Sequence, residues 1–157
     1  MKKKYRHSIR LYHLTANPIK RFYWFFTRPN FTGVKSLIQH KDTFLFVRNS
    51  YGTKKWTLPG GGVKRNEKLV KAMKRETLEE VGILLKDCIH IGFYKNSLYN
   101  REGTVHCYYA KINNPILDID PQEIEEAKWC RLDNTPKPTG SAVGEVLNLY
   151  KKYYGIN

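Results

Sequence analysis

Cysteine is scarce in this chain of 157 residues, which has only Cys88, Cys107 and Cys130. Their number is odd and no pair has CxxC spacing, so we expect neither a disulfide framework nor a structural zinc site. The five histidines form no recognisable ligand pattern either. We therefore expect reduced thiols and a cytoplasmic protein.

Long apolar runs are also missing. No run approaches the roughly 20 residues that cross a membrane. The basic segment MKKKYRHSIR is not followed by an apolar stretch of about 7 residues, so we expect no secretory signal. The longest aromatic run, FYWFF at 22–26, lies within a predicted short helix at 17–30. We expect it to pack against the domain; the alternative is an interfacial membrane anchor.

Acidic residues are almost absent from the first part of the chain. Residues 1–66 hold 15 Lys/Arg against one acid, Asp42, whereas the remainder holds 13 of each. The first part therefore accounts for the whole net charge of +14. Such an asymmetry favours anionic partners such as phosphates, nucleic acid or an acidic membrane surface. Simple solubility is the alternative explanation.

The order of predicted elements indicates one α/β domain. We expect two strands around an HKDT turn at 33–50 and a short strand that ends in Leu58. A helix is expected at 67–81, capped by Asn66 and ended by Gly82. Strands follow near 83–95, 104–112 and 125–132, with a polar loop at 96–103 and a last helix at 141–154. This order suggests a mixed sheet with helices on both faces, at 31–157, after a basic and aromatic extension at 1–30.

The predicted helix at 67–81 carries an unusual set of acids. At about 100° per residue, Glu76 and Glu80 fall within about 20° of Leu69, at the edge of the stripe that should be buried. Clustered like charges are expensive to bury unless a cation offsets them, and Arg75 alone cannot neutralise three carboxylates. Hard oxygen ligands suit Mg²⁺ or Mn²⁺. An ion-pair network is the alternative to a metal site.

The glycine triplet at 60–62 lies directly before this helix. Without side chains, its backbone can approach a ligand closely, although tight turns use glycine as well. A carbonyl from the loop and carboxylates from the helix could together complete a coordination sphere.

The segment GGVKRNEKLVKAMKRETLEEVGI (61–83) resembles the Nudix box, G-x5-E-x7-R-E-U-x-E-E-x-G-U, where U is a bulky apolar residue. Eight positions match: Gly61, Glu67, Arg75, Glu76, Glu79, Glu80, Gly82 and Ile83. Thr77 departs, since an apolar residue is usual there. The segments WTLPGGGV and EIEEAKWCRLD, on either side, are also similar to those of the family, so the resemblance covers roughly 33–150.

The resemblance implies a Nudix-type α/β/α sandwich with a mixed β-sheet, and hydrolysis of the diphosphate linkage of a nucleoside diphosphate derivative. Glu76, Glu79 and Glu80 would be metal ligands, with Glu79 or Glu80 as base. Glu67 would support them, Arg75 would orient Glu79, and the Gly61 carbonyl and Glu123 would be further ligands. Bound Mg²⁺ or Mn²⁺ would neutralise the phosphate oxygens and acidify the attacking water.

Substrate recognition stays open at this point. Arg48, Lys54 and Lys55 lie just before the glycine loop and are candidates for binding phosphates; a solvated hairpin is the alternative. A small nucleotide is one substrate class, and the RNA 5′ end is another, because the first part of the chain is basic and aromatic. A non-enzymatic nucleotide-binding module is a third reading, although such modules would be expected to lose box glutamates and this chain retains all four. The sequence gives no indication of the oligomeric state.

Overall fold

The computed structural model describes residues 31–98 and 101–156. The helix expected at 17–30 and the extension at 1–30 lie outside the described residues. Among the described residues, no helix has the length and apolar character needed to cross a membrane.

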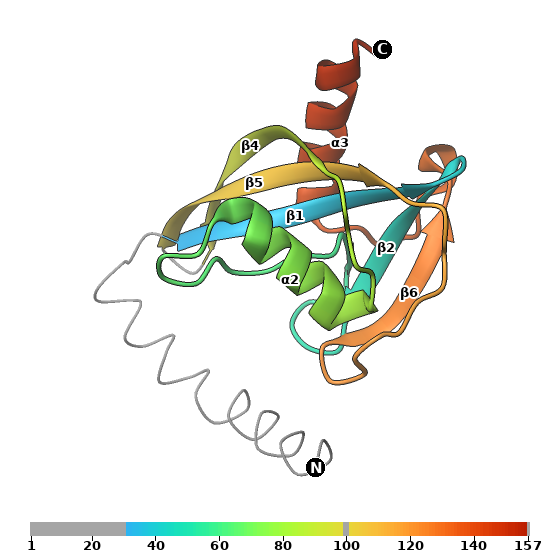
Figure 1. The fold of residues 1–157 in the computed structure, drawn as a ribbon, viewed down its shortest axis with the longest axis horizontal. Coiled ribbons are helices and arrows are strands. Elements are labelled where there is room, and N and C mark those ends of the chain that lie inside the picture. Colours follow the sequence, from blue (N-terminus) through green and yellow to red (C-terminus); the bar gives the residue numbers. More distant parts are fainter. Residues whose placement is uncertain (1–30, 99–100, 157) are drawn as a thin grey trace.

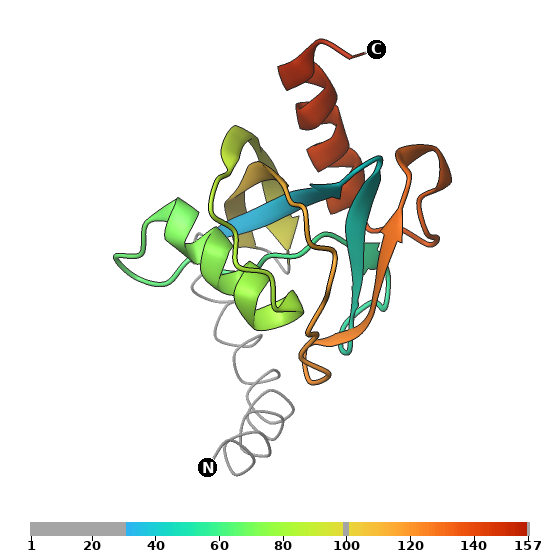
Figure 2. The ribbon, with the colours of Figure 1, turned by 45° about the vertical axis from the view of Figure 1, so that its right-hand side comes forward.

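A mixed sheet lies between two helices that cover its opposite faces (Figure 1). The strands are β1 Phe31–His40, β2 Thr43–Asn49, β3 Trp56–Thr57, β4 Ile89–Leu98, β5 Arg101–Lys111 and β6 Ile124–Cys130. The helices are α2 Leu69–Val81 and α3 Ser141–Tyr154, with a short 3₁₀ turn at Leu132–Asn134. Figure 2 shows α2 and α3 on either side of β1, the arrangement expected of an α/β/α sandwich.

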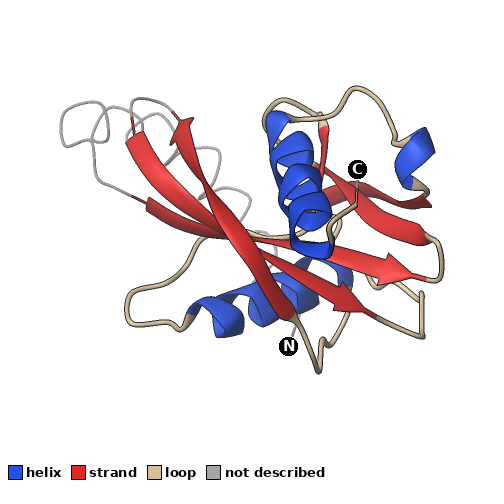
Figure 3. Cartoon of the chain, turned by 90° about the horizontal axis from the view of Figure 1, so that it is seen from above, coloured by secondary structure: helices blue, strands red, loops and turns tan. Residues whose placement is uncertain are grey.

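Alternation along β1 builds both halves of the core. Val34 and Ile38 belong to the buried cluster that includes Met73 of α2. Leu37, which points the other way, belongs to the cluster that includes Val143 and Val146 of α3. Because successive side chains of a strand face opposite sides, one apolar strand can hold both helices. The view from above in Figure 3 shows the two helices separated by the strands.

The glycine loop, residues 59–63, is hydrogen-bonded to β1 next to the site. β1 runs parallel to β5 over nine residue pairs, but pairs with β2 only at Gln39–Phe44 and His40–Thr43, next to their turn. Beyond that point β2 pairs instead with β3, and β6 pairs with β2 from Phe44 to Asn49. Along the first half of β1, residues 59–63 are hydrogen-bonded to the strand. The amide of Val34 donates to Gly61 O at 2.9 Å, and that of Ser36 donates to Pro59 O at 2.9 Å. The loop is therefore fixed directly against the central strand.

Three of the expected elements differ from the structure. α2 begins at Leu69 rather than 67, and its N-cap residue is Lys68, so the expected Asn66 cap and a helix start at Glu67 are both wrong. The polar segment at 96–103 is not a long loop, since β4 and β5 extend to Leu98 and from Arg101. The strand expected near 83–95 begins only at Ile89, because 83–88 is irregular. By contrast, Gly82 ends α2 with a φ of 72°, as expected.

Candidate active site

Two glycines allow the loop to approach both β1 and α2. Gly60 has a φ of 134°, and a Cβ there would lie 2.2 Å from Val34 O, which no side chain could tolerate. At Gly61 a Cβ would lie 2.6 Å from the carboxyl carbon of Glu76. Glycine is therefore required at Gly60 by close backbone contact and by backbone conformation, whereas a Cβ at Gly61 would displace the Glu76 carboxyl group.

Three carboxylates gather beside this loop. Glu76 and Glu80 come from α2, and Glu123 directly precedes β6. Pairing of β6 with β2 brings Glu123 to this end of the sheet, where its carbonyl accepts from the amide of Ser50 at 2.8 Å. One carboxylate oxygen from each residue lies within 4.8 Å of those from the other two. The side chain of Glu80 also accepts a hydrogen bond from the Gly60 amide at 2.8 Å.

Burial sets the protonation of Glu80. This residue is only 4% exposed, and burial raises the pKa of its carboxyl to about 7. The Lys35 ammonium and the Gly60 amide oppose that rise, whereas the carboxylates of Glu76 and Glu123 add to it. A carboxyl so close to other carboxylates is a strong acceptor for a cation that replaces its proton.

Arg75 forms a five-bond network at the other side of the site. Its guanidinium donates to both carboxylate oxygens of Glu67, at 2.8 Å each, and to Gly62 O at 3.0 Å. It also donates to Glu76 at 2.7 Å and to Glu79 at 3.0 Å. Hydrogen bonds from Arg75 first, then from the Lys64 amide, lower the pKa of Glu67 to about 2. Its bonds to the glutamates, chiefly Glu67, raise the pKa of Arg75. This network ties the glycine loop to α2.

The four glutamates of the Nudix-box segment thus lie in two different environments. Glu76 and Glu80 lie in the close group with Glu123. Glu79 lies outside that group, with 52% of its side chain exposed and its carboxylate paired with Arg75. Glu67 likewise pairs with Arg75 rather than joining the group. The structure therefore brings together some of the expected ligands and leaves Glu79 facing solvent, accessible to a substrate or a water molecule.

Thr77, which departs from the family pattern, is fully buried and satisfied. Its hydroxyl lies 3.1 Å from that of Ser36, which in turn donates to Pro59 O at 3.2 Å. Because a buried hydroxyl needs a partner, Thr77 depends on Ser36 in β1. The pair adds another tie between α2 and the loop.

Lys35 is a site residue that the sequence reasoning missed. Its ammonium donates to Leu58 O at 2.6 Å and to Gly60 O at 3.2 Å. Burial lowers the pKa of this lysine, against the opposing effects of Glu80 and Glu76. A lysine within an otherwise apolar strand, in GVKSLI, was the available signal.

The three cations expected to bind phosphate, Arg48, Lys54 and Lys55, differ in their ion-pair partners. Arg48 pairs with Glu126 at 2.7 Å and lies over the ring of Trp56. Lys54 and Lys55 are both exposed, and Lys54 pairs with Glu125 at 2.8 Å. Arg48 and Lys54 are thus already engaged by carboxylates, which weakens the expectation that they meet a substrate directly.

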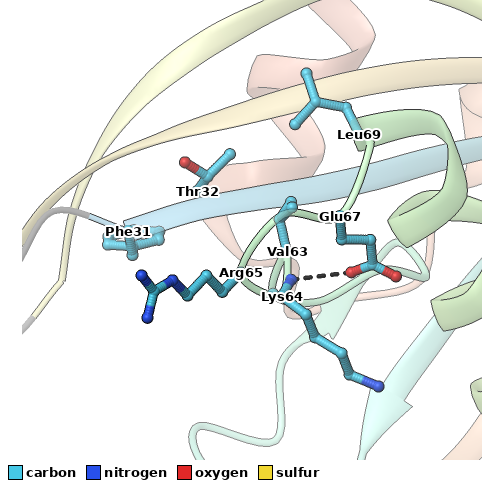
Figure 4. Close-up of a pocket in the computed structure, with 8 residues that line it drawn as sticks. Phe31, Thr32, Val63, Lys64, Arg65, Glu67 and Leu69 are labelled. Carbon is cyan, nitrogen blue, oxygen red and sulfur yellow. Dashed lines mark hydrogen bonds between the residues drawn. The ribbon is translucent and has the colours of Figure 1, made fainter.

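A pocket of about 620 Å³ flanks the carboxylate group. It is lined by Phe31, Thr32, Gly62, Val63, Lys64, Arg65, Glu67 and Leu69. Figure 4 shows these side chains between the start of β1 and the segment before α2, with the Lys64 amide bonded to Glu67. Gly62 and Glu67 also contact Arg75, so the pocket adjoins the site without enclosing its three close carboxylates.

Comparisons with known proteins agree with this arrangement. A NUDIX domain model matches residues 27–149. The asymmetrical bis(5′-nucleosyl)-tetraphosphatase of Caenorhabditis elegans is 32% identical over 117 residues, which cover 72% of this chain and 83% of that protein. The NAD-capped RNA hydrolase NudC of Salmonella heidelberg is 26% identical over 113 residues, covering 70% of this chain but only 43% of the relative.

Solved structures have the same fold. A MutT NUDIX hydrolase from Burkholderia pseudomallei superposes with a TM-score of 0.72 at 23% identity, covering 77% of this chain and 98% of that one. An Ap4A hydrolase from C. elegans, solved as a binary complex, gives 0.68 at 24% identity, covering 80% and 98%.

The match over most of the chain shows that this protein belongs to the Nudix family. It has the family's α/β/α sandwich and is a hydrolase that acts on phosphoric anhydride bonds. Nudix hydrolases generally use divalent metal ions, and homologues of this chain bind nucleotide substrates.

Proposed function

We propose that this chain is a Mg²⁺- or Mn²⁺-dependent pyrophosphohydrolase that cleaves the diphosphate linkage of a small nucleoside diphosphate derivative. The observation that carries the proposal is the group formed by Glu76, Glu80 and Glu123 beside the glycine loop. Three close carboxylates, one of them buried, form an oxygen-only donor set that fits a hard divalent cation. When bound, such a cation would neutralise phosphate oxygens and activate water.

The protein's own groups have separate roles in this proposal. Glu76, Glu80 and Glu123 would hold the cation, together with the Gly61 carbonyl. Glu79, exposed beside Arg75, would accept the proton of an attacking water, and its hydrogen bond from Arg75 would hold it in place. Glu67 supports the arrangement from the other side of Arg75. Among the candidate cations for the substrate phosphates, Arg48 and Lys54 are engaged in ion pairs, whereas Lys55 forms none within the described part of the chain.

We assign the hydrolase domain to residues 31–157 and treat 1–30 as an extension. The three cysteines are unpaired, which supports a cytoplasmic site of action.

Dinucleoside polyphosphates are the first substrates to test, because the tetraphosphatase relative aligns over most of both chains.

The test is a substrate panel with the purified chain. Nucleoside triphosphates, nucleotide sugars, diadenosine tetraphosphate and 5′-triphosphorylated RNA are incubated with Mg²⁺, with Mn²⁺ or with EDTA, and the products are separated by chromatography. We expect cleavage of a phosphoric anhydride bond that EDTA abolishes. Glu76→Gln should lose activity, whereas the matched control Glu145→Gln, an exposed carboxylate on α3, should not. Undiminished turnover in EDTA would contradict metal dependence.

The RNA 5′ end is a second candidate, favoured by a cationic surface next to the site. Lys64, Arg65, Lys68 and Lys71 are exposed at the start of α2 and before it. None of the four forms an ion pair with a carboxylate among the described residues, and residues 1–30 contain no Asp or Glu that could pair with them. Phosphate contacts make binding fall steeply with salt. A kcat/KM for triphosphorylated RNA well above that for nucleoside triphosphates at low salt would favour this substrate.

A further inference from the structure

The Lys35 ammonium is anchored to the glycine loop. Lys35 is paired in register with Cys107 of β5, whose side chain belongs to the core cluster under α3. The lysine stem therefore lies on the sheet face opposite α2. Its ammonium reaches the loop edge and donates to the carbonyls of Leu58 and Gly60, both buried residues. A charged donor on two buried carbonyls is a strong local restraint.

The backbone of Gly60 is consequently held at several points, on both sides of its Cα. Its carbonyl accepts from Lys35 at 3.2 Å, while the Gly60 amide donates to Glu80 at 2.8 Å. Its Cα packs so tightly on the backbone of Val34 and Lys35 that no Cβ would fit. The next residue, Gly61, accepts from the Val34 amide at 2.9 Å. The position of Glu80 relative to β1 thus depends on a peptide that Lys35 helps to fix.

We propose that Lys35 is a positioning residue: by holding the carbonyls of Leu58 and Gly60, it fixes the Gly60 backbone and through it the places of the Glu80 carboxylate and the Gly61 carbonyl. Lys35 need touch neither the substrate nor the cation for this role. The part of the proposal that concerns metal binding rests on the proposed function; the part that concerns the loop does not.

A purely electrostatic role makes the opposite prediction. The Lys35 charge lies near Glu80 and Glu76, so it repels a cation that approaches them. If charge were its whole contribution, removing it would tighten metal binding. If positioning dominates, removing it weakens metal binding although the site has become more negative.

The experiment compares three full-length variants with the wild type. Lys35→Met keeps the apolar stem and removes the donors and the charge, and Lys35→Arg keeps both. Lys95→Met is the matched control, because it removes the same charge from an exposed lysine of β4 that donates to Thr104. Should Lys35→Met fail to fold, Lys35→Gln takes its place. The readouts are amide hydrogen exchange of Gly60 in EDTA, Mn²⁺ affinity by electron paramagnetic resonance, and kcat and KM in Mg²⁺.

We expect Lys35→Met to lower the exchange protection of Gly60 by about 10-fold or more. Its Mn²⁺ dissociation constant should rise about 10-fold, the scale for losing an outer support of a metal site. The kcat should fall by a similar factor while KM stays within about threefold, and Lys35→Arg should recover most of each loss.

Unchanged Gly60 exchange, or tighter Mn²⁺ binding in Lys35→Met, would overturn the positioning role. Equal losses in Lys95→Met would do so as well, because they would assign the effect to net charge. If the wild type binds no Mn²⁺, the proposed function fails, and the exchange of Gly60 alone decides the role of Lys35.

Discussion

The buried carboxyl of Glu80 should give the metal-free protein an unusual dependence of stability on pH. Burial raises its pKa from 4.5 to about 7. Between these values the folded protein retains a proton that the unfolded chain releases. The free energy of unfolding therefore falls as pH rises from about 4.5 to about 7 and stays low above that range. Since each pKa unit corresponds to about 1.4 kcal/mol, the loss amounts to at most about 3 kcal/mol.

Glu80→Gln isolates this effect. Glutamine has nearly the same shape, and its amide oxygen can accept from the Gly60 amide as the carboxylate does. It carries no charge at any pH. In EDTA at pH 8 we expect the variant to be more stable than the wild type, by up to about 3 kcal/mol. Near pH 5, where Glu80 is largely protonated in the folded protein, the advantage should disappear.

Urea unfolding followed by tryptophan fluorescence measures both proteins across this pH range. The difference between the two curves cancels the other titrations, such as that of His106, whose pKa is lowered by burial. Glu145→Gln on α3 is the control for loss of an exposed carboxylate. A difference between wild type and Glu80→Gln that stays constant within about 0.5 kcal/mol, the range of ordinary surface substitutions, would refute the reasoning.

Addition of Mg²⁺ should reverse the order at pH 8. A ligand that binds only the folded state stabilises it by mass action. The wild type should gain stability with Mg²⁺ concentration, and Glu80→Gln should gain much less because one of the three close carboxylates is missing. Equal gains would mean that Mg²⁺ binds elsewhere.

Three further substitutions test separate parts of the site. Glu79→Gln should lower kcat by about 10² with little change in Tm, since the side chain is exposed; an unchanged kcat would exclude Glu79 as base. Gly60→Ala should destabilise the protein by more than about 2 kcal/mol in urea unfolding, because its Cβ would lie 2.2 Å from Val34 O. The salt dependence of kcat/KM between about 50 and 300 mM should flatten more in Lys55→Ala than in Lys54→Ala, since Lys54 is already paired with Glu125. Slopes equal to that of the wild type would assign both lysines to the solvated surface.

Elements with strong local signals could be predicted from the sequence. The hairpin around the HKDT turn, the Gly82 end of α2 and the helix at 141–154 all agree with the structure. In each case the deciding information lies within a few neighbouring residues: a tight turn, a glycine in the left-handed region or an apolar stripe at helical spacing.

The start of α2 could not be predicted because side-chain contacts of Glu67 override local capping. Asn66 would suit an N-cap, yet it has a φ of 61°, and the helix begins only at Leu69. The Glu67 carboxylate accepts hydrogen bonds from the Lys64 amide and from Arg75, which lies within α2 eight residues further along the chain. These bonds hold the segment before α2 in a turn instead of continuing the helix.

The segment at 96–103 shows the same limit for strands. Its polar residues suggested a loop, but they continue the β4–β5 ladder, with Asn96 opposite Gly103 and Leu98 opposite Arg101. Strand formation depends on the partner across the sheet as well as on local polarity. A single strand pattern cannot reveal that partner.

For the site, residue spacing was sufficient to predict where Glu76 and Glu80 lie on α2, but not which residues surround them. Helical geometry places Glu76 and Glu80 at one edge of the buried stripe, and the structure has them there. Glu123 could be suggested only by its place relative to the family pattern, because 43 residues separate it from Glu80. Lys35 was not considered, since no local pattern indicates which backbone atoms a strand residue will meet.

The arrangement of cations explains why a basic protein can retain this acidic cluster. Arg75 uses its five donors on Glu67, Glu76, Glu79 and Gly62, and none of them reaches Glu80. Lys35 lies close enough to oppose the rise in the Glu80 pKa, but its ammonium donates to carbonyls. Between Glu76 and Glu80, these two cations therefore offset the repulsion only in part. A cation that binds there relieves the repulsion, and this relief adds to its affinity. Stability that the metal-free protein lacks above pH 7 should thus return as binding free energy for the metal.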